Sequence, residues 1–138
     1  MAADAAAPRI LVVDDEESVR EFTERALKTA GYDVMAAASG KQALEVVERS
    51  GPFDGFVLDV VMPGMSGSEL GQELRRIDPD AKILYFTGFS DKLFADKQTL
   101  GALEAFVEKP LTMSGLLEAV SLLLYGDLRN PEKARPKR

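Results

Sequence analysis

Two residue types that carry much of protein chemistry are missing from this sequence. The chain has 138 residues and contains neither cysteine nor histidine. The lack of cysteine excludes disulfides, thiolate zinc sites and a cysteine nucleophile. The lack of histidine excludes histidine-based catalytic triads and most zinc hydrolase sites. It also means that the chain has no histidine of its own to carry a phosphoryl group.

Long apolar runs and an excess of positive charge are missing as well. No apolar run reaches the length needed to cross a bilayer, and the first eight residues lack the basic start and apolar stretch of a secretion signal. The net charge is −6, which argues against nucleic acid as the main ligand. These absences predict a cytoplasmic protein that binds neither membranes nor nucleic acid.

Length and composition fit a single domain with a core of its own. Hydrophobic residues make up 46% of the chain, which supplies the material for that core. We predict a disordered amino-terminal tail at residues 1–7, one domain at residues 8–126 and a basic tail at residues 127–138. The basic tail is expected to be solvated and disordered.

Five short apolar runs alternate with amphipathic stretches along the chain. The runs lie at residues 10–13, 34–38, 56–58, 83–86 and 105–107. Most are apolar at consecutive positions, which is typical of strands covered on both faces. The segments between them are too long for hairpins and therefore favour parallel strands. We predict an α/β fold, a doubly wound five-stranded parallel sheet with helices on both faces.

The segments between the runs carry signals for helix ends. Residues that can cap a helix at its start are Ser39, Ser66, and either Thr112 or Ser114. The first two open a capping-box pattern, with glutamine or glutamate three residues later. Gly126 can end the last helix. A further helix near residues 90–100 is expected from its place in the order, although its apolar stripe is weak.

Four of the five predicted strands end in a charged or hydroxyl-bearing residue. These residues are Asp14 with Asp15, then Asp59, Thr87 and Lys109. The carboxyl ends of parallel strands meet at one edge of the sheet, where such folds bind their ligands. Each residue taken singly could instead serve as a helix cap, a turn residue or a surface charge. Their joint occurrence at the same end of four strands favours a single site.

The charges of this predicted site indicate its chemistry. Two carboxylates about 4 Å apart repel each other by about 4 kcal/mol at an effective dielectric near 20, so three of them favour a bound cation. An open pocket with few carboxylates suits Mg²⁺ better than Ca²⁺. The metal and Lys109 would neutralise phosphoryl oxygens while one carboxylate attacks phosphorus. The composition of the site thus favours phosphoryl chemistry.

Four segments, in this order and at these spacings, resemble the receiver domains of response regulators in two-component signalling. They are residues 10–16, residues 58–67, Thr87-Gly88 and Glu108-Lys109-Pro110. The resemblance covers about residues 8–126. It implies a flavodoxin-like strand order of 2-1-3-4-5 and a phosphorylation-dependent switch rather than a turnover enzyme.

The resemblance also implies a role for each site residue. Asp59 corresponds to the phosphoacceptor, which takes a phosphoryl group from the phosphohistidine of a sensor histidine kinase or histidine phosphotransfer protein. Asp14 and Asp15 correspond to the acidic pair that holds Mg²⁺. Asp59 and the backbone carbonyl of Val61 complete the protein ligands of the metal.

Three further roles follow from the same resemblance. Thr87 corresponds to the hydroxyl that hydrogen-bonds the phosphoryl group, and Lys109 to the lysine that pairs first with Asp59 and then with the phosphoryl oxygens. Phe106 corresponds to an aromatic switch residue, although a residue of a buried strand can equally be ordinary core. The output is expected to pass by contact with an unknown downstream protein or by phosphorelay, from a monomer or weak dimer.

Several alternatives stay open from the sequence. An initiator Met1 and the charged tail favour a free-standing protein over an excised module of a hybrid histidine kinase. A phosphatase of the haloacid dehalogenase type would need an Asp-x-Asp pattern after the first strand, whereas Asp14 and Asp15 are adjacent. A flavodoxin-like cofactor binder would need a phosphate-binding loop there. A degenerate receiver that only binds partners would lack some of the site residues.

Overall fold

The β-strands of the chain form one parallel sheet. The structure is a computed structural model and describes residues 7–87, 104–108 and 112–126. The strands are β1 (Arg9–Val13), β2 (Asp33–Ala37), β3 (Gly55–Leu58), β4 (Ile83–Thr87) and β5 (Glu104–Glu108). They lie in the order β2-β1-β3-β4-β5, and every neighbouring pair is parallel. The predicted five-stranded sheet and its flavodoxin-like order are confirmed.

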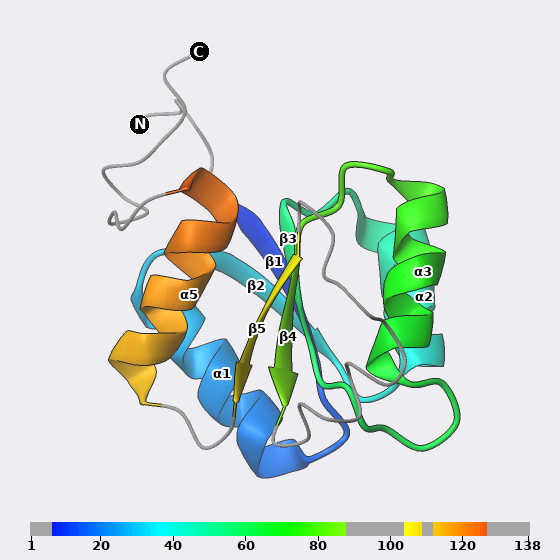
Figure 1. Cartoon of the computed structure of the whole chain (residues 1–138), viewed down its shortest axis with the longest axis horizontal. Coiled ribbons are helices and arrows are strands. Elements are labelled where there is room, and N and C mark those ends of the chain that lie inside the picture. Colours follow the sequence, from blue (N-terminus) through cyan, green and yellow to red (C-terminus); the bar gives the residue numbers. More distant parts are fainter. Residues whose placement is uncertain (1–6, 88–103, 109–111, 127–138) are drawn as a thin grey trace.

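Helices cover both faces of this sheet. The described helices are α1 (Glu17–Thr29), α2 (Gly40–Ser50), α3 (Gly67–Ile77) and α5 (Met113–Tyr125). Figure 1 shows α1 and α5 on one face of the sheet and α2 and α3 on the other. The predicted helix near residues 90–100, the predicted basic tail and residues 1–6 lie outside the described residues.

The doubly wound arrangement follows from side chains that are buried on both faces of the central strands β1 and β3. Along β1, Leu11 and Val13 join the apolar cluster under α2 and α3. The alternate residues Ile10 and Val12 join the cluster under α1 and α5. Each fully buried side chain of this size contributes about 1.5–3 kcal/mol. The consecutive apolar residues of the sequence therefore correspond to two cores separated by one sheet.

The predicted capping boxes differ in detail between α2 and α3. Before α3, Ser66 Oγ accepts a hydrogen bond from the Glu69 amide at 3.1 Å, and Glu69 Oε1 accepts one from the Ser66 amide at 2.9 Å. This box is complete. Before α2, Ser39 Oγ accepts from the Gln42 amide at 3.1 Å, but Gln42 Oε1 accepts from the Ala38 amide instead of the Ser39 amide. The second predicted box is therefore only half formed.

Both ends of α5 agree with the sequence prediction. Thr112, rather than Ser114, provides the cap, because its Oγ1 accepts a hydrogen bond from the Gly115 amide at 3.0 Å. Gly126 follows the helix with φ 79°, a left-handed conformation that favours glycine. None of the helices in the described part of the chain has the length and apolar character needed to cross a membrane.

Candidate functional site

The sheet itself sets the positions of Asp14 and Asp59. Each of these residues directly follows the last residue of a central strand, β1 or β3. The Asp14 amide donates a hydrogen bond to the Ala37 carbonyl at 3.2 Å, and the Asp59 amide donates one to the Val13 carbonyl at 2.9 Å. Their backbones thus continue the hydrogen-bond ladder beyond the strands. Both side chains are buried, with 2% and 6% of their surface exposed.

Three carboxylates meet at this carboxyl edge of the sheet, which is the lower edge in Figure 1, where the arrowheads of β4 and β5 point. One carboxylate oxygen from each of Asp14, Asp15 and Asp59 lies within 4.8 Å of the other two. Asp15 is exposed, whereas the other two are buried. At this separation each pair repels by roughly 3–4 kcal/mol at an effective dielectric near 20. The cluster is closed on the protein side and open to solvent at Asp15.

The donor set of this acidic cluster suits a hard divalent cation. Carboxylate oxygens are the ligands that Mg²⁺ and Ca²⁺ take in proteins, and Mg²⁺ commonly keeps several waters beside one or two carboxylates. A cluster of three carboxylates with one solvent-facing member leaves room for such waters. The residues present therefore fit the metal that the sequence predicted.

Local contacts hold Asp14 in place at the start of α1. Asp14 Oδ1 accepts a hydrogen bond from the Glu16 amide at 2.9 Å, and Arg20 Nη1 donates one to the Asp14 carbonyl at 2.8 Å. Glu16 is the residue before α1, and its side chain makes no capping bond. The sequence did not predict this contact of Arg20, because an arginine in the second turn of a helix does not by itself indicate which group it binds.

The segment between β3 and α3 begins at Asp59 and borders a hollow of its own. A hollow of about 490 Å³ is lined by residues of this segment and of the first turns of α3. Val61 lies in it with 41% of its surface exposed. Gly64 has φ 80°, which gives the turn a left-handed residue. The predicted ligand Val61 therefore lies two residues from Asp59, on a turn that faces solvent.

The other predicted site residues are described only in part. The backbone of Thr87 ends β4 and pairs with Glu108 at the end of β5, so Thr87 lies at the carboxyl edge of the sheet. Phe106 pairs with Tyr85 inside the sheet. The side chains of Thr87 and Phe106 lie outside the described part of the structure, as does the whole of Lys109. Their predicted roles remain predictions.

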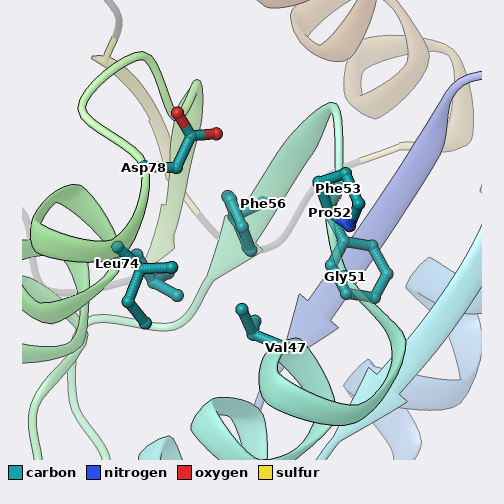
Figure 2. Close-up of a pocket in the computed structure, with 8 residues that line it drawn as sticks. Val47, Gly51, Pro52, Phe53, Phe56, Leu74 and Asp78 are labelled. Atoms are coloured by element: carbon teal, nitrogen blue, oxygen red, sulfur yellow. The ribbon is translucent and has the colours of Figure 1, made fainter.

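A second hollow lies at the opposite edge of the sheet and has a different character. It has a volume of about 450 Å³ and lies between the ends of α2 and α3 and the start of β3. Figure 2 shows Val47, Phe56 and Leu74 around it, with Asp78 at its side. Asp78 is the only charged residue of its described lining, and its Oδ1 accepts a hydrogen bond from the Asp80 amide at 3.0 Å. The acidic cluster is therefore the better candidate for chemistry.

Comparison with known proteins agrees with this assignment. The sequence matches the response regulator receiver domain family over residues 10–121. Sensor kinase CckA of Brucella abortus (strain 2308) is 40% identical over 116 residues, which cover 83% of this chain and 12% of the kinase. Sporulation initiation phosphotransferase F of Bacillus subtilis (strain 168) is 32% identical over 117 residues, which cover 84% of this chain and 93% of that protein.

Solved structures show the same architecture. The response regulator TrrA of Thermotoga maritima, in complex with Mg²⁺-BeF, has a TM-score of 0.74 and 38% identity, and the match covers 85% of this chain and 99% of that one. This chain spans half or less of the length of several other relatives. The strand order, the acidic cluster after β1 and β3 and the match over residues 10–121 together show that the chain belongs to the response regulator receiver domain family.

Proposed function

We propose that this receiver domain is a phosphorylation-dependent switch that takes a phosphoryl group onto Asp59 with the help of Mg²⁺. The observation that carries the proposal is the acidic cluster, in which Asp14, Asp15 and Asp59 offer oxygens within 4.8 Å of one another. The family consists of signalling domains, which makes a switch a better account than a classical turnover enzyme.

Asp59 is the proposed nucleophile. Its carboxylate forms a phosphorus–oxygen bond while the phosphorus–nitrogen bond of a partner's phosphohistidine breaks, and the imidazole leaves with the electron pair of that bond. The product is an acyl phosphate on Asp59. The two central strands hold the nucleophile through the hydrogen bond from the Asp59 amide to the Val13 carbonyl. Such preorganisation is how phosphoryl transfer is mainly accelerated.

The remaining residues of the site receive roles in binding and charge neutralisation. Asp14, Asp15 and Asp59, with the carbonyl of Val61, are the proposed protein ligands of Mg²⁺. When bound, the metal supplies positive charge against the phosphoryl oxygens. Thr87 is proposed to donate a hydrogen bond to the phosphoryl group, and Lys109 to pair with Asp59 and then with the phosphoryl oxygens.

The partners and the readout belong to the same proposal. The phosphodonor is a sensor histidine kinase or a histidine phosphotransfer protein, and the signal leaves by contact with a downstream protein or by phosphorelay. The proposal places the protein in the cytoplasm as a monomer or weak dimer. Phe106 on β5 is the proposed switch residue, which links the state of Asp59 to the surface around β5 and α5.

Phosphorylation in vitro tests the proposal. The purified protein is incubated with Mg²⁺ and acetyl phosphate, and its intact mass is read beside an Asp59→Asn variant. We expect one phosphoryl group on the wild-type chain, none on the variant and none after chelation of the metal. If the wild-type chain is inert, phosphohistidine donors are tried next, since some receivers use small donors poorly. Failure with both donor types would contradict the proposed phosphotransfer.

A further inference from the structure

The start of α3 lies unusually close to the backbone of the phosphoacceptor. A Cβ atom added at Gly67 would lie 2.2 Å from the Asp59 carbonyl oxygen and 2.8 Å from the Val60 Cα. Both distances are below 3.0 Å, a separation that real Cβ atoms essentially never undercut. Gly67 is not among the described glycines with positive φ. Steric contact with the phosphoacceptor backbone, and not backbone conformation, therefore excludes a side chain at this position.

Hydrogen bonds close the same segment into a compact turn. The Gly67 amide donates to the Val60 carbonyl at 2.8 Å. Ser66, directly before Gly67, and Glu69, two residues after it, form the complete capping box that fixes the first turn of α3. The chain from Asp59 to Gly67 thus leaves the end of β3 and folds back, so that the capped start of α3 bonds to the Val60 carbonyl.

We propose that Gly67 is a positioning residue for the metal and phosphoacceptor site. The inference rests on the proposed function, because it concerns how the chain holds Asp59 and the Val61 carbonyl toward Mg²⁺. By letting α3 pack against the Asp59 backbone, Gly67 sets the path of residues 59–61. The contact is between two backbones, so no flexible side chain can move aside to relieve a collision.

A collision at Gly67 has few ways to relax. The Asp59 amide is held by the Val13 carbonyl at 2.9 Å, on the strand beside it. α3 is held by its own buried residues Leu70 and Leu74, which are 0% and 1% exposed. We therefore expect an added methyl group to move the segment between β3 and α3, which contains the phosphoacceptor and the Val61 carbonyl. Displacements of roughly 1 Å in such a site reduce activity by about a hundredfold.

Gly71 provides a matched control on the same helix. It lies one turn further along α3, and a Cβ added there would lie 2.4 Å from the Tyr85 hydroxyl oxygen. That contact is also too short, but its partner is the far end of a buried side chain and not the backbone of Asp59. Gly67→Ala and Gly71→Ala therefore both crowd α3 against the sheet, and only the first does so against the phosphoacceptor.

The test measures Mg²⁺ affinity by isothermal titration calorimetry for the wild-type chain, Gly67→Ala and Gly71→Ala, with urea unfolding of each metal-free protein. We expect Gly67→Ala to raise the Mg²⁺ dissociation constant at least about tenfold, within the range found for residues that orient metal ligands. We expect Gly71→Ala to change it by less than about twofold, even where both variants lose stability. The metal-free Gly67→Ala protein is also expected to lose hydrogen-exchange protection of the residue 67 amide.

The outcomes separate this inference from the proposed function. A wild-type chain that binds no Mg²⁺ contradicts the proposed function. A wild-type chain that binds Mg²⁺ together with a folded Gly67→Ala variant of unchanged affinity overturns the role of Gly67 alone. Equal loss of affinity in both variants would also overturn it, because the effect would then be general loosening of α3.

A second variant keeps the inference testable where Gly67→Ala does not fold. The double variant Ser66→Ala/Glu69→Ala removes the capping box without adding an atom near Asp59. It is expected to loosen the start of α3 and to weaken Mg²⁺ binding several-fold, less than a direct collision would. The matching control is Ser39→Ala, which removes the cap of α2. Unchanged Mg²⁺ affinity in the folded double variant would overturn the inference.

Discussion

At the scale of single residues, the three aspartates of the acidic cluster differ in their burial. Asp14 and Asp59 are buried and tied to the sheet through their amides, whereas Asp15 is exposed. Because the Asp15 side chain is exposed, we expect removal of its charge to leave the backbone of the site unchanged. The residue is therefore the most direct probe of how the cluster balances repulsion against metal binding.

Asp15→Asn should change stability in opposite directions with and without metal. In the metal-free protein it removes one carboxylate from a cluster of three, so the free energy of unfolding is expected to rise, by less than about 1 kcal/mol because the group is exposed. With saturating Mg²⁺ the wild-type chain gains stability by mass action, and the variant is expected to gain much less. Thermal unfolding with Mg²⁺ and with chelator checks both signs. A variant that gains as much from Mg²⁺ as the wild type would contradict the assignment of Asp15 as a ligand.

Tyr32 gives a prediction for the alkaline range. Burial and the neighbouring Tyr125 raise the pKa of Tyr32, and its hydroxyl has no hydrogen-bond partner within the described part of the chain. The folded state thus keeps its proton longer than the unfolded state, where tyrosine titrates near pH 10. The contribution of neutral Tyr32 to the free energy of unfolding is therefore fully present below about pH 10. It is lost as the pH rises from there through the raised pKa of the folded state.

Tyr32→Phe should remove this alkaline loss. Near pH 7 the variant is expected to be as stable as the wild type or more stable, because it deletes a buried hydroxyl without a partner. Above about pH 10 the wild type should lose up to about 1.4 kcal/mol per pH unit relative to the variant. Urea unfolding between pH 7 and 11 measures the difference. Parallel pH profiles for both proteins would show that the hydroxyl is solvated or paired.

At the scale of elements, Gly126 ends α5 in a left-handed backbone conformation. Gly126 has φ 79° and a Cβ there would meet no atom within 4 Å, so the position has a conformational preference and no steric one. Gly126→Ala is expected to lower the free energy of unfolding by about 1–2 kcal/mol, the cost of a left-handed conformation for an ordinary residue. Gly126→Asn should recover part of this loss. Equal stability of the glycine, alanine and asparagine proteins in urea would contradict a conformational role for Gly126.

The sequence predicted the elements well where one local signal was sufficient. The consecutive apolar runs predicted all five strands, and Ser66, Thr112 and Gly126 marked helix ends that the structure confirms. The half-formed box at Ser39 could not be foreseen, because the choice of Gln42 between two neighbouring amides depends on three-dimensional geometry. The close packing of Gly67 on Asp59 was likewise hidden, since it joins residues eight positions apart through a turn.

At the scale of the whole molecule, one sheet separates two apolar cores. Leu11 is fully buried at the centre of β1, under α2 and α3. Leu11→Ala is expected to lower the free energy of unfolding by about 2–5 kcal/mol, the usual range for a leucine deleted from a core. The control Leu122→Ala removes the same atoms from a side chain that is 51% exposed and should cost much less. Equal losses in urea unfolding would contradict the described burial.

The topology explains why the acidic cluster could be predicted from the sequence. Parallel strands bring their carboxyl ends to one edge, so Asp14 and Asp59 were expected to meet although 45 positions separate them in the sequence. Membership of the receiver family then decides against the phosphatase and flavodoxin-like alternatives. Charge pattern alone could not reveal the contact of Arg20 with the Asp14 carbonyl, because it depends on how α1 is placed relative to the end of β1.

The central claim is that Asp59 carries the phosphoryl group, and identification of the modified residue tests it most directly. The chain is phosphorylated in the presence of Mg²⁺ and reduced with borohydride, which converts an aspartyl phosphate to homoserine. The modified position is then found by tandem mass spectrometry. The account predicts homoserine at position 59 and an unreduced carboxylate at each of the other 22 acidic positions of a chain with 23 aspartates and glutamates. Homoserine at another position, or a phosphoryl group that survives reduction on a serine or threonine, would contradict it.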